Sequence, residues 1–169
     1  MILQKFYPNE YMDSTYSIDF KQLKQDGVNG LIFDIDNTLV PHGAPADSKI
    51  ITLFQQLKEQ GFLICLLSNN KRPRVESFAT AVGVDYIFDG HKPSKKNYEK
   101  AMEIMNTTKE HTVFIGDQLF TDIYGANRVG IKSILVQPIH KSEEIQIVLK
   151  RYLEGIVLYF YKKNKKMGK

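Results

Sequence analysis

The feature that most constrains the fold is a series of apolar, strand-like runs separated by amphipathic segments. In the run GLIFDI (residues 30–35), three large apolar residues in succession precede the first aspartate, which favours a strand buried on both faces. Such strands are typical of parallel sheets covered by helices on both sides. Further strand-like segments follow at residues 62–68, 85–89, 111–117 and 132–138. The pattern therefore predicts a five-stranded parallel sheet.

Amphipathic segments alternate with these strands, and alternation of this kind indicates an α/β fold. We expect a Rossmann-like three-layer sandwich, with helices at residues 17–27, 46–61, 72–84, 94–106, 119–130 and 142–161. A chain of 169 residues suits one domain. Residues 1–169 are therefore predicted to form a single domain, with a lead-in (1–27), a core (28–140) and a C-terminal helix and basic tail (142–169).

The net charge of +4 belongs to the C-terminal tail, because the last nine residues contain five lysines and no acid. Without them the chain has 18 basic and 19 acidic residues, and no pattern of base-stacking aromatics accompanies the lysines, so nucleic acid is an unlikely partner on this reading. The N-terminus lacks the apolar region of a signal peptide. A single cysteine, Cys65, lies in the apolar run FLICLL, which fits a reducing cytoplasm.

Four aspartates lie where predicted strands end or the next helix begins. Asp34 and Asp36 follow the first strand, and Asp117 and Asp122 lie in GDQLFTD. In open α/β sheets ligands bind outside the carboxyl ends of the strands, so these acids should share one crevice. Clustered carboxylates repel one another, and Mg²⁺, which prefers oxygen ligands, would relieve the repulsion. Helix capping is the alternative for each aspartate taken alone.

Groups that could bind an anion follow two other strands. Ser68 and Asn69 precede a helix N-terminus, whose free N–H groups suit a phosphate, and Lys92 adds a positive charge. Taken alone, the first two could be an N-cap and the third a solvated lysine. A cation site beside an anion site suits phosphoryl transfer. In such a reaction one carboxylate can act as nucleophile and a second as general acid and base.

At this point the sequence resembles the haloacid dehalogenase superfamily. DIDNT resembles its motif I, LLSNN motif II, HKPSKKNY motif III and GDQLFTD motif IV, in order along residues 30–136. The resemblance implies an Mg²⁺-dependent phosphatase with Asp34 as nucleophile and Asp36 as general acid and base. It further implies phosphate contacts or support of the nucleophile from Thr38, Ser68, Asn69 and Lys92. The metal would be held by Asp34, Asp117 and the backbone carbonyl of Asp36, with Asp122 supporting them or acting through a water.

The spacing of the motifs leaves no room for a cap domain. One helix and one strand use most of the 30 residues from Thr38 to Ser68, and the same holds for the 24 residues from Ser68 to Lys92. With its lead-in, the chain resembles the capless subclass IIIA, YqeG-type branch, which is related to phosphatidylglycerophosphate phosphatases. This resemblance implies an open site that takes a phosphorylated small molecule or lipid, and capless members tend to form homo-oligomers.

The C-terminal segment carries an apolar stripe followed by lysines. The stripe consists of Ile145, Val148, Leu149, Tyr152, Leu153 and Ile156. Apolar and aromatic faces with flanking lysines occur in helices that lie on membrane surfaces, so peripheral membrane contact is one reading. The other is a helix packed on the sheet or on a partner, with a disordered tail.

Two further functions were weighed against a phosphatase. A phospho-acceptor domain of the bacterial receiver type is disfavoured, because its lysine follows the last strand whereas Lys92 lies in mid-chain. An interaction scaffold with incidental phosphatase activity is the remaining alternative, and the intact set of catalytic positions disfavours it.

Overall fold

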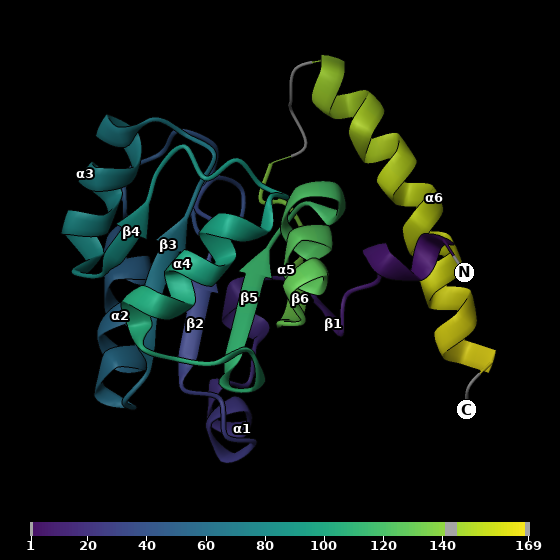
Figure 1. Ribbon diagram of the computed structural model, residues 1–169. Coiled ribbons are helices and arrows are strands. Elements are labelled where there is room, and N and C mark those ends of the chain that lie inside the picture. Colours follow the sequence, from purple (N-terminus) through teal and green to yellow (C-terminus); the bar gives the residue numbers. More distant parts are fainter. Residues whose placement is uncertain (1, 141–144, 168–169) are drawn as a thin grey trace.

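The computed structural model describes residues 2–140 and 145–167. Within these ranges the chain forms an α/β fold around a six-stranded parallel sheet of order β1-β6-β5-β2-β3-β4 (Figure 1). The strands are β1 (Glu10–Met12), β2 (Gly30–Phe33), β3 (Leu63–Leu67), β4 (Asp85–Ile87), β5 (Thr112–Gly116) and β6 (Lys132–Val136). The predicted α/β class with a parallel sheet is therefore confirmed.

The sheet has one strand more than predicted, and that strand comes from the lead-in. β1 pairs in parallel with β6, with Met12 opposite Val136. Its three residues, Glu10 to Met12, are all half-buried. So short a segment shows neither the continuous apolar run nor the strict alternation that marks a strand in a sequence. The lead-in therefore completes one edge of the sheet.

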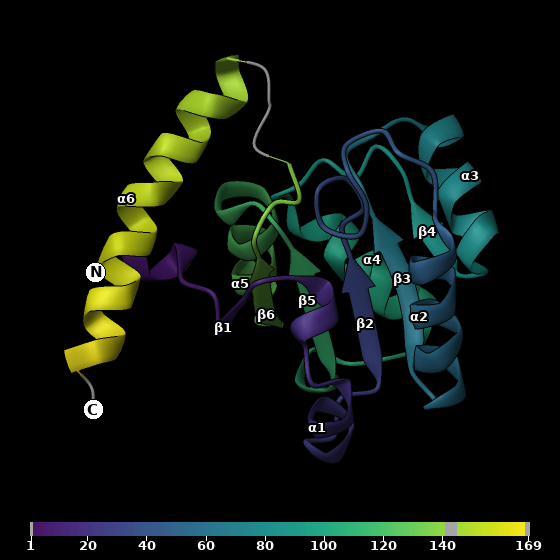
Figure 2. The same ribbon diagram turned by 180° about the vertical axis from the view of Figure 1, so that it is seen from behind.

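Three helices cover one face of the sheet (Figure 2). They are α1 (Phe20–Gln25), α2 (Ser48–Glu59) and α3 (Arg72–Val82), and a short 3-10 turn, η2 (Thr15–Ser17), precedes them. Leu31 and Phe33 point to this face, because alternate residues of a strand point to opposite sides. Asp47 caps α2 by accepting a hydrogen bond of 2.8 Å from the backbone N–H of Ile50.

The opposite face carries α4 (Lys95–Met105) and α5 (Tyr124–Val129) (Figure 1). The segment predicted as one helix at 119–130 begins as a π-helical turn, η4 (Leu119–Ile123), before α5, and a 3-10 turn, η3 (Lys109–His111), precedes β5. Ile32 and Cys65 point to this face, and burial raises the pKa of the Cys65 thiol to about 12. This cysteine is a core residue, as its apolar surroundings in the sequence predicted.

The C-terminal helix α6 (Ile145–Met167) lies outside the sandwich, beside the N-terminal turn η1 (Ile2–Phe6) (Figure 1). Val157 and Tyr161 of this helix are buried, and the Tyr161 ring packs edge-on against Tyr7 with ring centroids 5.4 Å apart. The helix runs on through the lysine-rich segment as far as Met167, where a disordered tail was one expectation. Its predicted beginning at residue 142 lies outside the described residues.

The predicted apolar stripe of this helix is not its packing face. Tyr152, Leu153 and Ile156 are exposed, whereas the buried side is formed by Glu154, Val157 and Tyr161. The side chains of the other predicted members, Ile145, Val148 and Leu149, lie outside the described residues. Among the residues that the structure describes, no helix is long and apolar enough to cross a bilayer.

Candidate active site

The topology gathers the predicted site residues at the carboxyl edge of the sheet. Asp34 directly follows β2, Ser68 follows β3 and Asp117 follows β5. Lys92 lies in the loop after β4, and Asp122 in the π-helical turn η4. Because β2 pairs with both β3 and β5, the strand ends that carry the first three residues are immediate neighbours.

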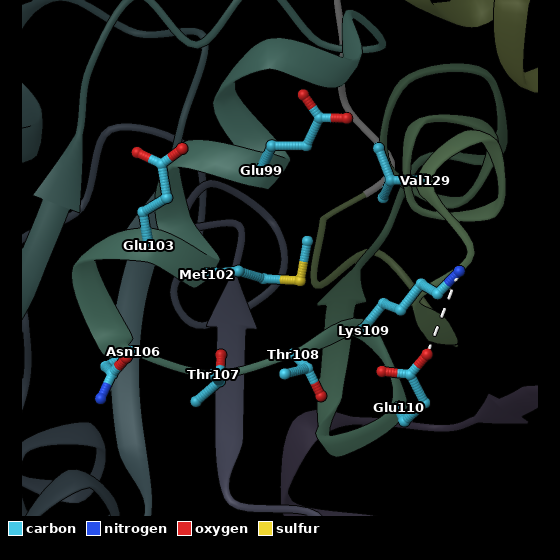
Figure 3. A pocket seen from close by; sticks show the side chains of 9 residues that line it. All are labelled: Glu99, Met102, Glu103, Asn106, Thr107, Thr108, Lys109, Glu110 and Val129. Atoms are coloured by element: carbon cyan, nitrogen blue, oxygen red, sulfur yellow. Dashed lines mark ion pairs between the residues drawn. The ribbon is translucent and has the colours of Figure 1, made fainter.

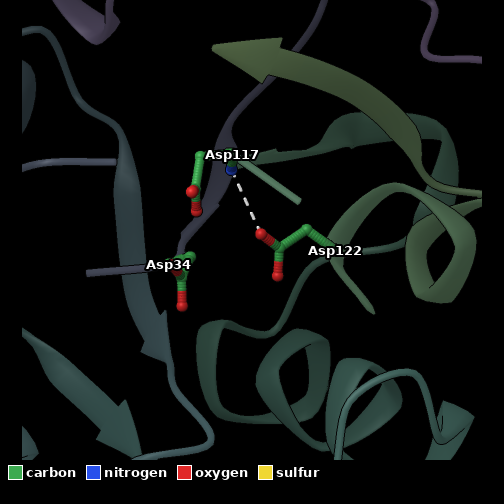
Figure 4. A group of neighbouring side chains, drawn as sticks. All are labelled: Asp34, Asp117 and Asp122. Atoms are coloured by element: carbon green, nitrogen blue, oxygen red, sulfur yellow. Dashed lines mark hydrogen bonds between the residues drawn. The ribbon is translucent and has the colours of Figure 1, made fainter. Parts of the chain in front are cut away.

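Three of the four predicted acids form a buried cluster. Asp34, Asp117 and Asp122 each place one carboxylate oxygen within 4.8 Å of the others (Figure 4). Burial, followed by the charges of the other two acids, raises the pKa of Asp117 well above its usual range. For Asp34, burial is again the largest cause and raises the pKa to about 6. A set of oxygen donors with excess negative charge fits a hard divalent cation.

Lys92 is the positive charge inside this cluster. Its Nζ donates to Asp34 Oδ1 at 2.6 Å and to Asp122 Oδ1 at 2.7 Å. Only 3% of its side chain is exposed. Burial opposes the charged form, but the two carboxylates outweigh it and raise the pKa of Lys92, so the side chain stays an ammonium.

The turn after Asp34 places Thr38 over the acids. Asn37 has a positive φ of 61°, a conformation that asparagine tolerates better than most residues, and its backbone N–H donates to the carbonyl of Val40 at 2.8 Å. This reversal brings the Thr38 hydroxyl 3.1 Å from Asp117 Oδ1 and 3.4 Å from Asp34 Oδ2. The hydroxyl of Thr38, a residue predicted at the phosphate site, therefore contacts the carboxylates that follow β2 and β5.

The side chain of Asp36 is outside the group of three clustered acids and is held by other donors. Its carboxylate accepts hydrogen bonds from the Gly43 backbone at 2.8 Å, from Arg74 Nη2 at 2.9 Å and from Asn70 Nδ2 at 3.1 Å. Burial would raise the pKa of Asp36, but these donors together lower it below its usual value. The side chain is thus outside the group of potential metal ligands, which is compatible with a metal contact from its backbone carbonyl instead.

Ser68 and Asn69 serve the loops around the cluster. The Ser68 hydroxyl is buried and accepts a hydrogen bond of 3.1 Å from the backbone N–H of Asn70, as a capping side chain would. Asn69 holds the loop that bears Lys92, because its Oδ1 accepts from the Lys92 backbone N–H at 2.7 Å and its Nδ2 donates to the Lys92 carbonyl at 3.4 Å. Asn69 therefore positions the lysine through its backbone.

The Asp122 carboxylate lies so close to the end of β5 that position 116 must be a glycine. Its Oδ2 accepts hydrogen bonds from the backbone N–H groups of Asp117 at 3.1 Å and Gln118 at 3.0 Å. A Cβ on Gly116 would lie 2.5 Å from this oxygen, closer than any real contact. The glycine of the GD pair therefore lets the Asp122 carboxylate approach the end of β5.

Sequence reasoning missed two arginines at this site. Arg74, in the first turn of α3, binds Asp36, and its place just after Ser68-Asn69 was the available signal. Arg151, in α6, forms an ion pair with Asp117, and its Nη1 also donates to the Asp117 backbone carbonyl at 2.6 Å. Nothing in the local sequence links residue 151 to the strand ends, because the contact depends on where α6 docks.

A separate cavity of about 760 Å³ lies at the other end of β5 (Figure 3). It is lined by residues from α4, the segment before β5 and α5, namely Glu99, Met102, Glu103, Asn106, Thr107, Thr108, Lys109, Glu110 and Val129. The segment that lines it enters β5 at its amino end, opposite the acid cluster. This hollow is therefore remote from the candidate site.

This fold and this cluster define a class of hydrolase, and comparison with known proteins identifies it. The haloacid dehalogenase-like hydrolase family matches residues 44–130, just over half of the chain. The chain belongs to the haloacid dehalogenase-like hydrolases and is a phosphatase of that superfamily. The matched stretch begins after Asp34 and Asp36, so it includes Ser68, Lys92 and Asp117 but not the first motif.

A relative that covers nearly the whole chain is the probable phosphatase YqeG of Bacillus subtilis. It is 37% identical over 159 residues, which is 93% of this chain and 92% of that protein. Phosphatidylglycerophosphate phosphatase 1 of Arabidopsis thaliana is 26% identical over 141 residues, 78% of this chain but 40% of its own length. The cobalt-bound deoxy-D-mannose-octulosonate 8-phosphate phosphatase of Haemophilus influenzae has the same fold, with a TM-score of 0.52 at 15% identity over 83% of this chain and 92% of that one.

Proposed function

We propose that this phosphatase hydrolyses a phosphate monoester through an aspartyl-phosphate on Asp34, with Mg²⁺ as cofactor. The observation that carries the proposal is the placement of Asp34 at the end of a buried strand, paired with Lys92 and adjacent to Asp117 and Asp122. A carboxylate held in this way is rigidly presented, and Lys92 reduces the repulsion that an incoming phosphate would meet. Positioning and charge neutralisation are the main needs of phosphoryl transfer.

In the first step a carboxylate oxygen of Asp34 attacks the phosphorus atom, and the bond from phosphorus to the leaving oxygen breaks. Asp36 donates a proton to that oxygen, so the product is an alcohol. Thr38, Ser68 and Lys92 are the proposed contacts of the transferred phosphoryl group, and Asn69 supports them by holding the Lys92 loop. These are the roles that the resemblance in the four motifs implies, and they are assigned here to the side chains in their observed positions.

In the second step water hydrolyses the aspartyl-phosphate. Asp36 takes a proton from the water, whose oxygen attacks phosphorus, and the bond to Asp34 breaks to release inorganic phosphate. Asp36 is ionised once it has given its proton to the leaving oxygen, and its contacts with Arg74 and Gly43 stabilise this form, which can accept a proton from the water. General base catalysis of this type contributes about 10²–10⁴-fold to a rate.

Asp34, Asp117 and the backbone carbonyl of Asp36 are the proposed ligands of Mg²⁺, and Asp122 supports them. The cation would neutralise charge on the phosphoryl oxygens as they pass through the transition state. The donor set supports this choice, because it consists of oxygens and Mg²⁺ favours one or two carboxylates with waters and phosphate. The Haemophilus influenzae phosphatase, a structural neighbour with the same fold, is itself a cobalt-bound form.

The test is release of inorganic phosphate from p-nitrophenyl phosphate by the wild type and by Asp34→Asn, with Mg²⁺ and with EDTA. We expect turnover by the wild type with Mg²⁺, and a loss of at least about 10³-fold in the variant, because the amide cannot form the covalent intermediate. Lys163→Ala, a change on the exposed tail helix, is the control that should retain turnover on this soluble substrate. Equal turnover by Asp34→Asn and wild type would refute the covalent mechanism.

For the substrate we propose a lipid-borne phosphate of the phosphatidylglycerophosphate type, in line with the capless subclass IIIA, YqeG-type resemblance. An exposed face of α6 supports this choice, since Tyr152, Leu153, Ile156, Tyr159 and Phe160 recur at helical spacing and lysines follow them. Such a face suits peripheral contact with an anionic membrane. It could instead bind a second copy of the chain, since capless members tend to form homo-oligomers, or another protein, as a scaffold would require.

A substrate panel separates these outcomes. It contains sugar phosphates, nucleotides and phosphatidylglycerophosphate in mixed micelles, assayed with wild type and with Tyr152→Ser/Tyr159→Ser. A lipid preference that the double variant loses, with turnover of p-nitrophenyl phosphate intact, supports membrane contact. Unchanged lipid turnover together with a fall in molecular mass by light scattering assigns the face to self-association. Absence of turnover on every substrate favours a scaffold.

A further inference from the structure

The α6 helix docks beside the candidate site through polar contacts that no pattern in the sequence indicates. Lys150 Nζ donates to Gln118 Oε1 at 2.8 Å, and Glu154 Oε1 accepts from the Leu119 backbone N–H at 2.9 Å. Gln118 and Leu119 are the two residues that follow Asp117 in the chain. The N-terminal half of α6 is thus fastened to the loop that leaves β5, whereas its C-terminal half packs through Val157 and Tyr161.

Arg151 extends these contacts to the acid cluster itself. Its Nη2 pairs with Asp117 Oδ2, and its Nη1 donates to Glu154 Oε2 at 3.1 Å. The Asp117 side chain is fully buried, whereas 20% of the Arg151 side chain is exposed. The guanidinium therefore reaches from the solvent side onto a carboxylate that also belongs to the candidate metal cluster.

We propose that Arg151 and the divalent cation compete for Asp117, so that occupancy of the metal site controls how tightly α6 is held over the active site. The inference rests on the proposed cation site and adds its regulation. Without the cation, the guanidinium neutralises Asp117. When the cation binds, Arg151 gives up this carboxylate and keeps Glu154, its neighbour one turn along α6.

The physical reason is repulsion between two positive charges that share one buried carboxylate. Like charges at contact distance repel each other where water is partly excluded, and a divalent ion doubles the repulsion that a univalent one would exert. The Thr38 hydroxyl donates to the other oxygen of Asp117 at 3.1 Å, so both oxygens of this carboxylate have a partner before a cation binds. Coupling between two binding events is reciprocal, so each weakens the other equally.

The first measurement is the affinity for Mg²⁺ alone, by isothermal titration calorimetry of the full chain without substrate. We expect Arg151→Gln to bind Mg²⁺ about 10-fold more tightly than wild type, within the roughly 5–150-fold range of such couplings. Arg151→Lys keeps the charge on a shorter side chain and should fall between the two. The matched control is Lys163→Gln, which removes an exposed positive charge near the other end of the same helix and should leave the affinity unchanged.

The second measurement is hydrogen–deuterium exchange of residues 150–161 with and without Mg²⁺. In wild type, Mg²⁺ should speed exchange in this segment, whereas in Arg151→Gln exchange should be fast and independent of the cation. Equal or weaker Mg²⁺ affinity in Arg151→Gln, slower exchange in wild type on adding Mg²⁺, or absence of Mg²⁺ binding in both proteins would each overturn the proposal. If Arg151→Gln does not fold, Arg151→Lys and the wild-type exchange data decide.

These readouts do not depend on catalysis. Competition between Mg²⁺ and Arg151 in a protein that turns over no phosphate ester would uphold this inference and refute the proposed phosphatase mechanism. Turnover that needs Asp34 and Mg²⁺, with no change of affinity in Arg151→Gln, would do the reverse.

Discussion

In the part of the chain that the structure describes, the three clustered acids pair with two cations from very different regions, the loop after β4 and the helix α6. Lys92 lies inside the core, touches Asp34 and Asp122, and is held at its backbone by Asn69. Arg151 reaches Asp117 from a helix outside the sandwich and is partly exposed. The comparison teaches that the same kind of ion pair can be a fixed part of a site or an exchangeable one, depending on what anchors the cation.

The strongest test of this contrast is Lys92→Met, which removes the anchored cation and keeps much of the side-chain volume. Two buried carboxylates then lose their partner, and breaking a buried pair costs about 3–5 kcal/mol of unfolding free energy. We expect that loss in urea denaturation of metal-free protein, together with loss of phosphatase activity. The corresponding loss in Arg151→Gln should be smaller, because the glutamine amide can still donate to Asp117 and because 20% of the Arg151 side chain is already exposed. Equal losses in the two variants would abolish the distinction between them.

The next effect is a dependence of stability on pH in the metal-free protein. The pKa of Asp34 is raised from 3.8 to about 6, so between these values the folded chain binds more protons than the unfolded chain. Stability should therefore fall as pH rises from about 4 to 6, by at most about 3 kcal/mol for this group. Asp117 has a raised pKa too and acts in the same direction.

Urea denaturation at pH 4.5, 5.5 and 6.5 in the presence of EDTA measures this slope, with Asp34→Asn as the comparison. The variant lacks the titrating carboxyl and should show a shallower fall. Asp36, whose pKa is lowered, contributes with the opposite sign and only at pH below the usual range of a carboxyl. A wild-type protein whose stability rises steadily from pH 4.5 to 6.5 would contradict the expected charge balance of the cluster.

The smallest effect compares a glycine beside the acid cluster with a glycine of α6. Gly116→Ala would place a Cβ 2.5 Å from Asp122 Oδ2, and overpacking of this kind costs about 1–3 kcal/mol. Gly155→Ala, in α6, meets nothing within 4 Å and should stabilise the helix by up to about 1 kcal/mol. Thermal unfolding should therefore move in opposite directions for the two variants. A higher unfolding temperature in both variants would mean that the close approach of Asp122 to Gly116 is not required.

Much of the core could be predicted from the sequence, because local patterns determine it. The apolar runs fixed five of the six strands, and the position of Asp34 and Asp117 after such runs placed both at the same sheet edge. Lys92 followed from the order of the motifs. These inferences needed the rules of parallel sheets, in which the end of a strand determines where its next residue lies.

The remainder depends on docking, which leaves no periodic signal. Strand β1 is too short to show an alternation, and the packing side of α6 is the one that bears Glu154, a charged residue that sequence patterns assign to solvent. Arg151 could not be found for the same reason. The sequence indicates where Asp36 lies along the chain, but the contacts of its side chain come from other elements, among them Arg74 in α3.

The pairing of β1 with β6 has a consequence for the order in which the chain is made. Met12 must wait for Val136 before it can join the sheet, and Asp117 is synthesised 34 residues before Arg151. The edge strand β1 is therefore among the first segments to be synthesised and among the last that can join the sheet. The ion pair between Asp117 and Arg151 likewise forms only once the chain has been made as far as α6.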